Sequence, residues 1–211
     1  MKLAVFSESP ADETAIRIIV EAILGAQTEP VALPSLRTRG WPSVRNVLPS
    51  VLKHLHYHTD AEACIIVVDS DDSSVHQESH KFDDTDEQCR VCQLNTSVNQ
   101  TLQHVSSVSG RMPLKTAIGL AVPAIEAWYR CGIDPHITEA MLIQGPEAGS
   151  RKLRNQLKRD VYGTDRPSLE LETRRAIEEA TRLIQNLDMI EHLFPNGFGT
   201  LARDVRGWQQ G

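Results

Sequence analysis

Acidic side chains follow two apolar runs of the sequence, and their placement predicts a metal site. Glu8 comes just after residues 3–6, and Asp69 and Asp71 come just after residues 64–68. If both runs are parallel strands of one sheet, the three carboxylates meet at its carboxyl edge. Gathered carboxylates repel one another unless a cation neutralises them. Oxygen ligands of this kind suit Mg²⁺ or Mn²⁺, metals that hold phosphates for displacement reactions.

Two further acids can join this site. Asp12 is four residues beyond Glu8, on the same side of the first turn of a predicted helix. Glu126 comes just after a third apolar run, residues 114–123. Each acid taken alone is also explained as a helix cap or a solvated turn residue, and Glu126 as one polar position of a helix. The joint placement of all these acids favours the metal site.

A second group of side chains has the spacing of zinc ligands. His76 and His80 are followed by Cys89 and Cys92, and two histidines with two cysteines can hold Zn²⁺ tetrahedrally. The alternative is a polar insertion with incidental thiols.

Basic residues gather in one predicted helix, residues 149–163. The ten residues 151–160 carry a net charge of +4, which makes them the best candidate for contact with a phosphate backbone. The alternative is a solvated helix face, or pairing with the acidic loop. The nucleic-acid-binding candidates are Arg151, Lys152, Arg154, Lys158 and Arg159.

Alternating strands and helices must position these residues. The first 132 residues predict an α/β fold, a Rossmannoid parallel sheet flanked by helices, with a polar insertion at about 72–110. Residues 133–211 predict a helical C-terminal extension. Expected strands cover residues 2–7, 29–34, 64–68 and 114–123. Expected helices cover residues 10–24, 41–58 (interrupted or kinked at Pro49), about 87–105, 123–130, 149–163, 168–187 and 196–208.

Length, charge and composition narrow the class of protein. The 211 residues fit one sizeable domain, and no apolar run approaches the ~20 residues of a membrane span. The first residues do not form a signal peptide, so we expect a cytoplasmic protein without a membrane partner. The net charge of −6 is local, because residues 69–87 carry −7 and the remainder carries +1. An acidic overall charge therefore does not exclude a nucleic-acid partner.

The stretches VFSESPADETAI and IIVVDSDD together resemble the Toprim pattern, in which a glutamate follows the first strand and Asp-x-Asp follows a later one. The spacing of Glu8 and Asp12 is similar to that of the OLD-nuclease branch. AVPAIEAWY and FPNGFGTLARDVRGW resemble segments of small stand-alone Toprim-like proteins of prokaryotic defence, which are often encoded beside an AAA-type ATPase. Ser9 stands where Toprim proteins usually have glycine.

The resemblance implies that Glu8, Asp69 and Asp71 are catalytic metal ligands, with Asp12 assisting and Glu126 completing a second metal position. It implies a Mg²⁺- or Mn²⁺-dependent nuclease or effector subunit of antiviral defence that acts on DNA or RNA beside an AAA-type ATPase. A homo-oligomer is left open. The alternative, which Ser9 and the acidic loop fit, is a catalytically inactive Toprim-like binding or regulatory module. A zinc-stabilised interaction protein is a third hypothesis.

Overall fold

The protein has an α/β fold built on one four-stranded parallel sheet. Its computed structural model describes residues 1–34, 40–77, 80, 88–144 and 151–209. The strand order is β2-β1-β3-β4, and each neighbouring pair is parallel, which confirms the predicted sheet. The strands are β1 (Lys2–Ser7), β2 (Glu29–Pro30), β3 (Ala63–Asp69) and β4 (Lys115–Ala121).

The register brings the carboxyl ends of the three longer strands to one edge. Ser7 at the end of β1 pairs with Val67, and Asp69 at the end of β3 pairs with Ala121 at the end of β4. All but the first or last residues of these strands are buried, because helices cover both faces. Acidic residues just beyond these ends are therefore held close together by the sheet itself.

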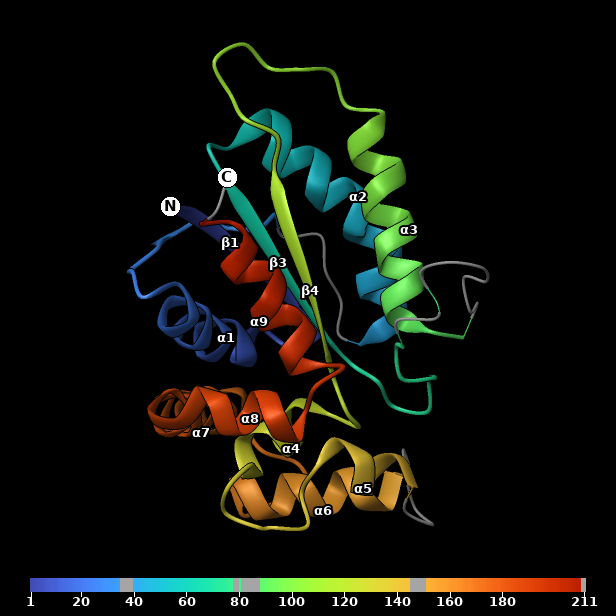
Figure 1. Ribbon diagram of the computed structural model, residues 1–211, viewed down its shortest axis with the longest axis vertical. Helices are drawn as coiled ribbons and strands as arrows, with labels where there is room; N and C mark the ends of the chain where they lie inside the picture. The colour runs from blue at the N-terminus through green and yellow to red at the C-terminus, as the bar shows by residue number, and fades with distance from the viewer. Residues whose placement is uncertain (35–39, 78–79, 81–87, 145–150, 210–211) are drawn as a thin grey trace.

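Helices from distant parts of the sequence cover each face (Figure 1). α1 (Pro10–Leu24) and α9 (Phe198–Gly207) lie on one face, and α2 (Trp41–His58) and α3 (Arg90–Gln103) lie on the other. α9 starts tight against β4, since a Cβ at Gly197 would clash with the carbonyl oxygen of Leu120. The C-terminal helices thus share one hydrophobic core with the sheet.

The remaining helices lie beyond the carboxyl edge or extend from it (Figure 1). α7 packs along α1, and α6 packs against α4. Among the helices of the described ranges, none has the length and apolar character needed to cross a bilayer. The elements are α4 (Ile125–Arg130), α5 (Glu139–Gln144), α6 (Arg151–Tyr162), α7 (Leu169–Leu183), a 3₁₀ turn (Ile184–Asn186) and α8 (Leu187–Leu193).

Three elements differ from the expectation. α2 is one helix that is not interrupted at Pro49, because its buried face, which includes Leu48 and Leu52, packs into the core on both sides of the proline. β2 has only two of the six expected residues, at the edge of the sheet. The helix expected to run to residue 187 changes to a 3₁₀ turn at Ile184 and then continues as α8.

Candidate functional site

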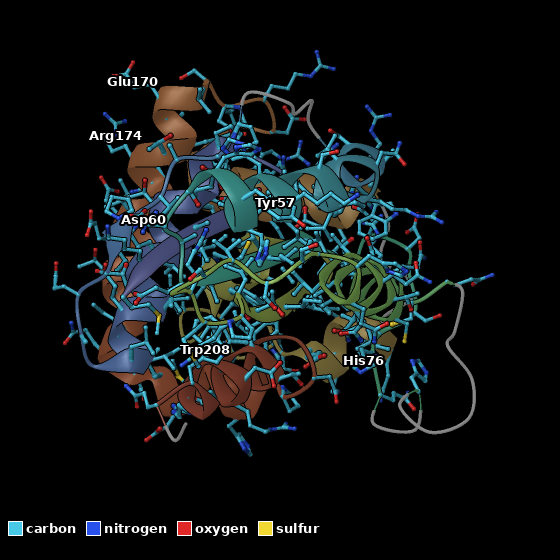
Figure 2. The ribbon with its side chains drawn as sticks, turned by 90° about the horizontal axis from the view of Figure 1, so that it is seen from above. Tyr57, Asp60, His76, Glu170, Arg174 and Trp208 are labelled. Atoms are coloured by element: carbon cyan, nitrogen blue, oxygen red, sulfur yellow. The ribbon has the colours of Figure 1, made fainter. Side chains whose placement is uncertain are left out.

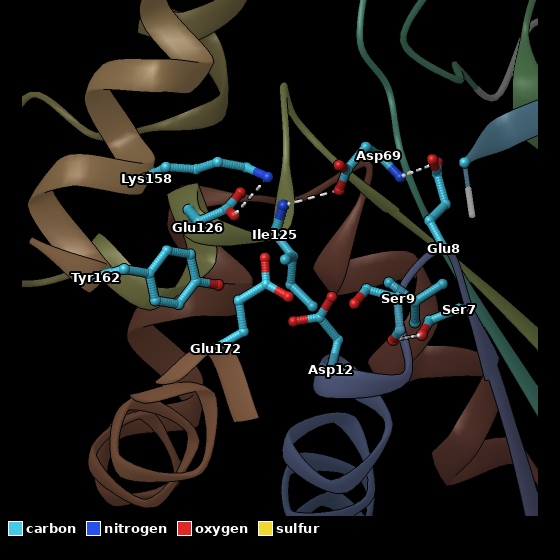
Figure 3. A pocket seen from close by; sticks show the side chains of 12 residues that line it. Ser7, Glu8, Ser9, Asp12, Asp69, Ile125, Glu126, Lys158, Tyr162 and Glu172 are labelled. Atoms are coloured by element: carbon cyan, nitrogen blue, oxygen red, sulfur yellow. Dashed lines mark hydrogen bonds and ion pairs between the residues drawn. The ribbon is translucent and has the colours of Figure 1, made fainter. Parts of the chain in front are cut away.

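A cavity of about 180 Å³ lies at the carboxyl edge of the sheet, and we call it the carboxylate pocket (Figure 3). Five acidic side chains line it, four from different helices and strands and one from the turn after β1. Lys158 is the one cation among its described lining residues. The acidic residues are Glu8 after β1, Asp12 in α1, Asp69 at the end of β3, Glu126 in α4 and Glu172 in α7.

Backbone hydrogen bonds join Glu8 and Asp69 to neighbouring strand ends. The N–H of Asp69 donates to Oε1 of Glu8 over 3.0 Å, and the N–H of Ile125 donates to Oδ1 of Asp69 over 2.9 Å. Glu8 therefore lies beside Asp69, as the strand order predicts, and Asp69 is tied to the start of α4.

Asp12 reaches the pocket from the first turn of α1. Ser9 caps this helix: its Oγ accepts the N–H of Ala11 over 3.3 Å. Its φ of −131° is extended, so a side chain is unstrained where Toprim proteins usually have glycine. The hydroxyl of Tyr129 donates to Oδ1 of Asp12 over 3.1 Å, which orients the carboxylate.

Glu126 and Glu172 complete the pocket, and both have an unpartnered oxygen. Glu126 is 4% exposed, and its Oε1 lies 3.8 Å from Nζ of Lys158. Oε2 of Glu126 and Oε2 of Glu172 are buried without a hydrogen-bond partner in the described part of the chain. The carboxylates of Asp12 and Glu172 lie close to each other in Figure 3. Buried carboxylate oxygens without a hydrogen-bond partner can coordinate a cation.

Burial in the pocket disfavours the charged form of its acids. It raises the pKa of Asp12 to about 8, with a further contribution from Glu126. Burial, together with Glu8 and Glu126, raises the pKa of Asp69 well above its usual range. The pKa values of Glu8 and Glu126 are also raised by burial, against the opposing effects of Arg90 and Lys158 respectively. A bound divalent ion would reverse these shifts.

Asp71, which we expected beside Asp69 in the same site, lies instead in a neighbouring hollow with Trp41. Its carboxylate forms ion pairs with Arg90, over 2.6 Å, and with Arg154. Asp71 has φ of 48°, a left-handed conformation in which aspartate is among the more tolerated residues. Because of this turn, the carboxylate of Asp71 points away from the carboxylate pocket and pairs with Arg90 and Arg154.

Arg90 connects the hollow to the carboxylate pocket. Its guanidinium donates to the carbonyl oxygen of Asp69 over 2.6 Å and to Oε1 of Glu8 over 3.3 Å, in addition to Asp71. The guanidinium also lies over the Trp41 ring, 4.8 Å from the ring centroid. This arginine therefore neutralises the outer side of the site.

The basic residues of α6 divide into two groups. Lys158 and Arg154 face the acidic residues described above. Arg151 and Lys152 are exposed at the start of α6, and Arg159 lies 3.5 Å from Asp165. The helix thus contributes two cations to the neutralisation of carboxylates and presents the others on the surface.

The predicted zinc ligands do converge, at a different place from the carboxylate pocket. The ligand atoms of His76, His80, Cys89 and Cys92, which we call the His-Cys cluster, all lie within 4.8 Å of one another. This group could hold a metal ion. His76 lies on the side of α3, across the molecule from Glu170 and Arg174 of α7 (Figure 2).

Sequence reasoning missed Glu172, Tyr162 and Arg90. Nothing in the sequence marks Glu172 or Tyr162 as a site residue. A glutamate in the first turn of a helix and a tyrosine on an apolar helix face are both common in proteins. Arg90 did carry a signal: a cation in the first turn of a helix is opposed by the helix dipole and needs acidic partners. Comparisons of the chain with protein-family models, with curated proteins and with solved structures found no match.

Proposed function

We propose that the chain is a Toprim-like nuclease that hydrolyses phosphodiester bonds with Mg²⁺ or Mn²⁺ in the carboxylate pocket. The observation that carries the proposal is the set of five converging carboxylates with Lys158 as their one lining cation in the described chain. Unpartnered oxygens on Glu126 and Glu172 support it, because each can become a ligand. A volume of about 180 Å³ leaves room for an ion and several waters, each of which takes ~30 Å³.

The side chains of the pocket suit this chemistry. A divalent ion would supply charge neutralisation and the activation of an attacking water. Asp12, Asp69, Glu126 and Glu172 offer the oxygens that would hold it. Tyr129 fixes the orientation of Asp12. Lys158, beside Glu126 at the same pocket, can bind a phosphate oxygen of the substrate. The same helix, α6, also presents Arg151 and Lys152 on the surface, and these cations suit a DNA or RNA backbone.

The biological setting in this proposal rests on the Toprim resemblance. It comprises a role in prokaryotic antiviral defence, a cytoplasmic location and an AAA-type ATPase as partner. Pull-down of the full chain with the product of a neighbouring ATPase gene would test the partnership directly.

Nuclease assays with two matched variants test the activity. Asp69 is the last residue of β3, whereas Asp60 lies before the strand begins and is an exposed residue paired with Lys2. Asp69→Asn should reduce Mn²⁺-dependent cleavage of DNA or RNA by more than about a hundredfold, since even outer-shell partners of a metal contribute ten- to hundredfold. Asp60→Asn should cleave like the unmodified chain. Equal cleavage by both variants would refute the proposal.

A second candidate, the inactive binding or regulatory module, is favoured by one observation. Arg90 donates to both Glu8 and Asp71, so a side chain occupies the place between two acids that the Toprim pattern assigns to metal. Mn²⁺ that stabilises the chain without any cleavage of DNA or RNA would support this candidate over the nuclease.

The second metal of the proposal is Zn²⁺, in the His-Cys cluster. Thiolate and imidazole ligands select zinc over Mg²⁺ and Mn²⁺, which prefer oxygen. The convergence of all four ligand atoms supports it.

A further inference from the structure

Three separations between ligand atoms of the His-Cys cluster match those of a tetrahedral metal site. Nδ1 of His76 lies 3.5 Å from Sγ of Cys89 and 3.5 Å from Sγ of Cys92, and Nδ1 of His80 lies 3.8 Å from Sγ of Cys92. Zinc–sulfur bonds of about 2.3 Å and zinc–nitrogen bonds of about 2.0–2.1 Å place such N and S atoms about 3.6 Å apart in a tetrahedron. The three separations therefore fit ligands around one ion.

Thiol–imidazole hydrogen bonds do not explain this arrangement as well. A neutral imidazole nitrogen has one lone pair and can accept well from one thiol, yet two sulfurs lie equally near Nδ1 of His76. All four cysteines of the chain are free and buried, so no disulfide competes for Cys89 or Cys92. His76 is only 6% exposed, Cys92 5% and Cys89 0%, which shields a bound ion from solvent.

Two residues of the His-Cys cluster lie on either side of Arg90 in the chain. Cys89 is at the N-cap position of α3, Arg90 is the first residue of this helix, and Cys92 lies in its first turn. We infer that the cluster is a structural zinc site that fixes the start of α3 and so positions Arg90 against Glu8 and Asp71. Arg90 is a positioning residue in this inference, which does not rest on phosphodiester hydrolysis.

Metal binding by the purified full chain tests the site. The chain should contain about one zinc ion, and replacement by Co²⁺ should give the intense visible bands and thiolate charge-transfer band of tetrahedral cobalt. Cys92→Ser and His80→Ala should lose both, whereas Cys131→Ser and His58→Ala, outside the cluster, should keep them. If Cys92→Ser does not fold, the partly exposed His80 still provides a ligand variant. A full chain that binds neither zinc nor cobalt would overturn the inference.

Fluorescence of Trp41 tests the link from zinc to Arg90. Removal of zinc by a chelator should change the emission of the chain, because the guanidinium leaves its place over the Trp41 ring. The change should be absent in Trp41→Phe and in Arg90→Met, which retains zinc but lacks the charge. A zinc-dependent change that persists undiminished in Trp41→Phe, or no change at all in the unmodified chain, would refute the positioning role.

Discussion

The two candidate metal sites of this protein are built in opposite ways. The carboxylate pocket gathers oxygens from parts of the chain spread between Glu8 and Glu172. The sheet register brings Glu8 and Asp69 together, and the packing of helices adds the other acids. The His-Cys cluster gathers nitrogen and sulfur from the short segment between His76 and Cys92. The first combination suits a hard, hydrated cation that is exchanged easily, and the second suits a tightly held zinc ion.

This difference predicts different roles for the two ions in stability. The pocket belongs to a sheet with a complete apolar core, so its ion relieves repulsion within a fold that already exists. The cluster joins a polar, acidic segment to α3, and that segment offers few apolar side chains to order it. Zinc should therefore stabilise its region more than Mg²⁺ or Mn²⁺ stabilises the pocket.

The largest effect is expected from removal of zinc. It should lower the free energy of unfolding by about 4 kcal/mol, the stabilisation that a ligand gives at a thousandfold excess over its Kd. Urea unfolding with and without a zinc chelator measures this loss. The double variant Cys89→Ser/Cys92→Ser should start at the lower stability and show no response to the chelator. A response equal to that of the unmodified chain would place the zinc elsewhere.

A smaller gain is expected from Mn²⁺ in the pocket. At a hundredfold excess over its Kd, Mn²⁺ should stabilise the chain by about 2.7 kcal/mol. Glu172→Gln should lose most of this gain, because it removes a charged ligand with an unpartnered oxygen. Glu170→Gln, on an exposed residue of the same helix turn, should keep it. Thermal melts over a Mn²⁺ titration separate the two variants, and equal shifts would remove Glu172 from the site.

The pocket should make the stability of the metal-free chain depend on pH in a defined direction. The pKa of Asp12 is raised from 3.8 to about 8, so the folded, metal-free chain keeps a proton that the unfolded chain releases between about pH 4 and 8. Its free energy of unfolding should fall as pH rises through this window. Mn²⁺ competes with protons, so its stabilisation should grow over the same range.

Unfolding midpoints at about pH 5 and about pH 8, with chelator or Mn²⁺, measure both trends. Asp12→Asn should make the metal-free decline less steep, because the amide does not titrate. If the free energy of unfolding of the metal-free chain instead rises between these two pH values, other groups of the protein already stabilise the charged form of the buried acids.

The two sites also differ in how far the sequence predicts them. The His-Cys cluster could be proposed from the spacing of its residues alone, because its four candidate ligands are near one another in the chain. Glu8 and Asp69 could be placed together because each follows a strand of a parallel sheet. Glu172 could not, since its position depends on how α7 packs along α1. The direction of Asp71 depends on Arg90, and therefore on where α3 begins, which no local pattern specifies.

The smallest effect concerns the surface beside the pocket. Arg151 is exposed at the start of α6, the helix that supplies Lys158 and Tyr162 to the pocket wall. If nucleic acid enters over α6, Arg151→Ala should weaken binding a few-fold and reduce the salt dependence of log K by about 0.9 for duplex DNA, or about 0.7 for a single strand. Arg174→Ala, on an exposed arginine of α7, should leave both unchanged (Figure 2). Fluorescence anisotropy over a salt series measures the two slopes. Equal slopes for the two variants would mean that the nucleic acid does not approach the carboxylate pocket over α6, even if the pocket binds its ion as expected.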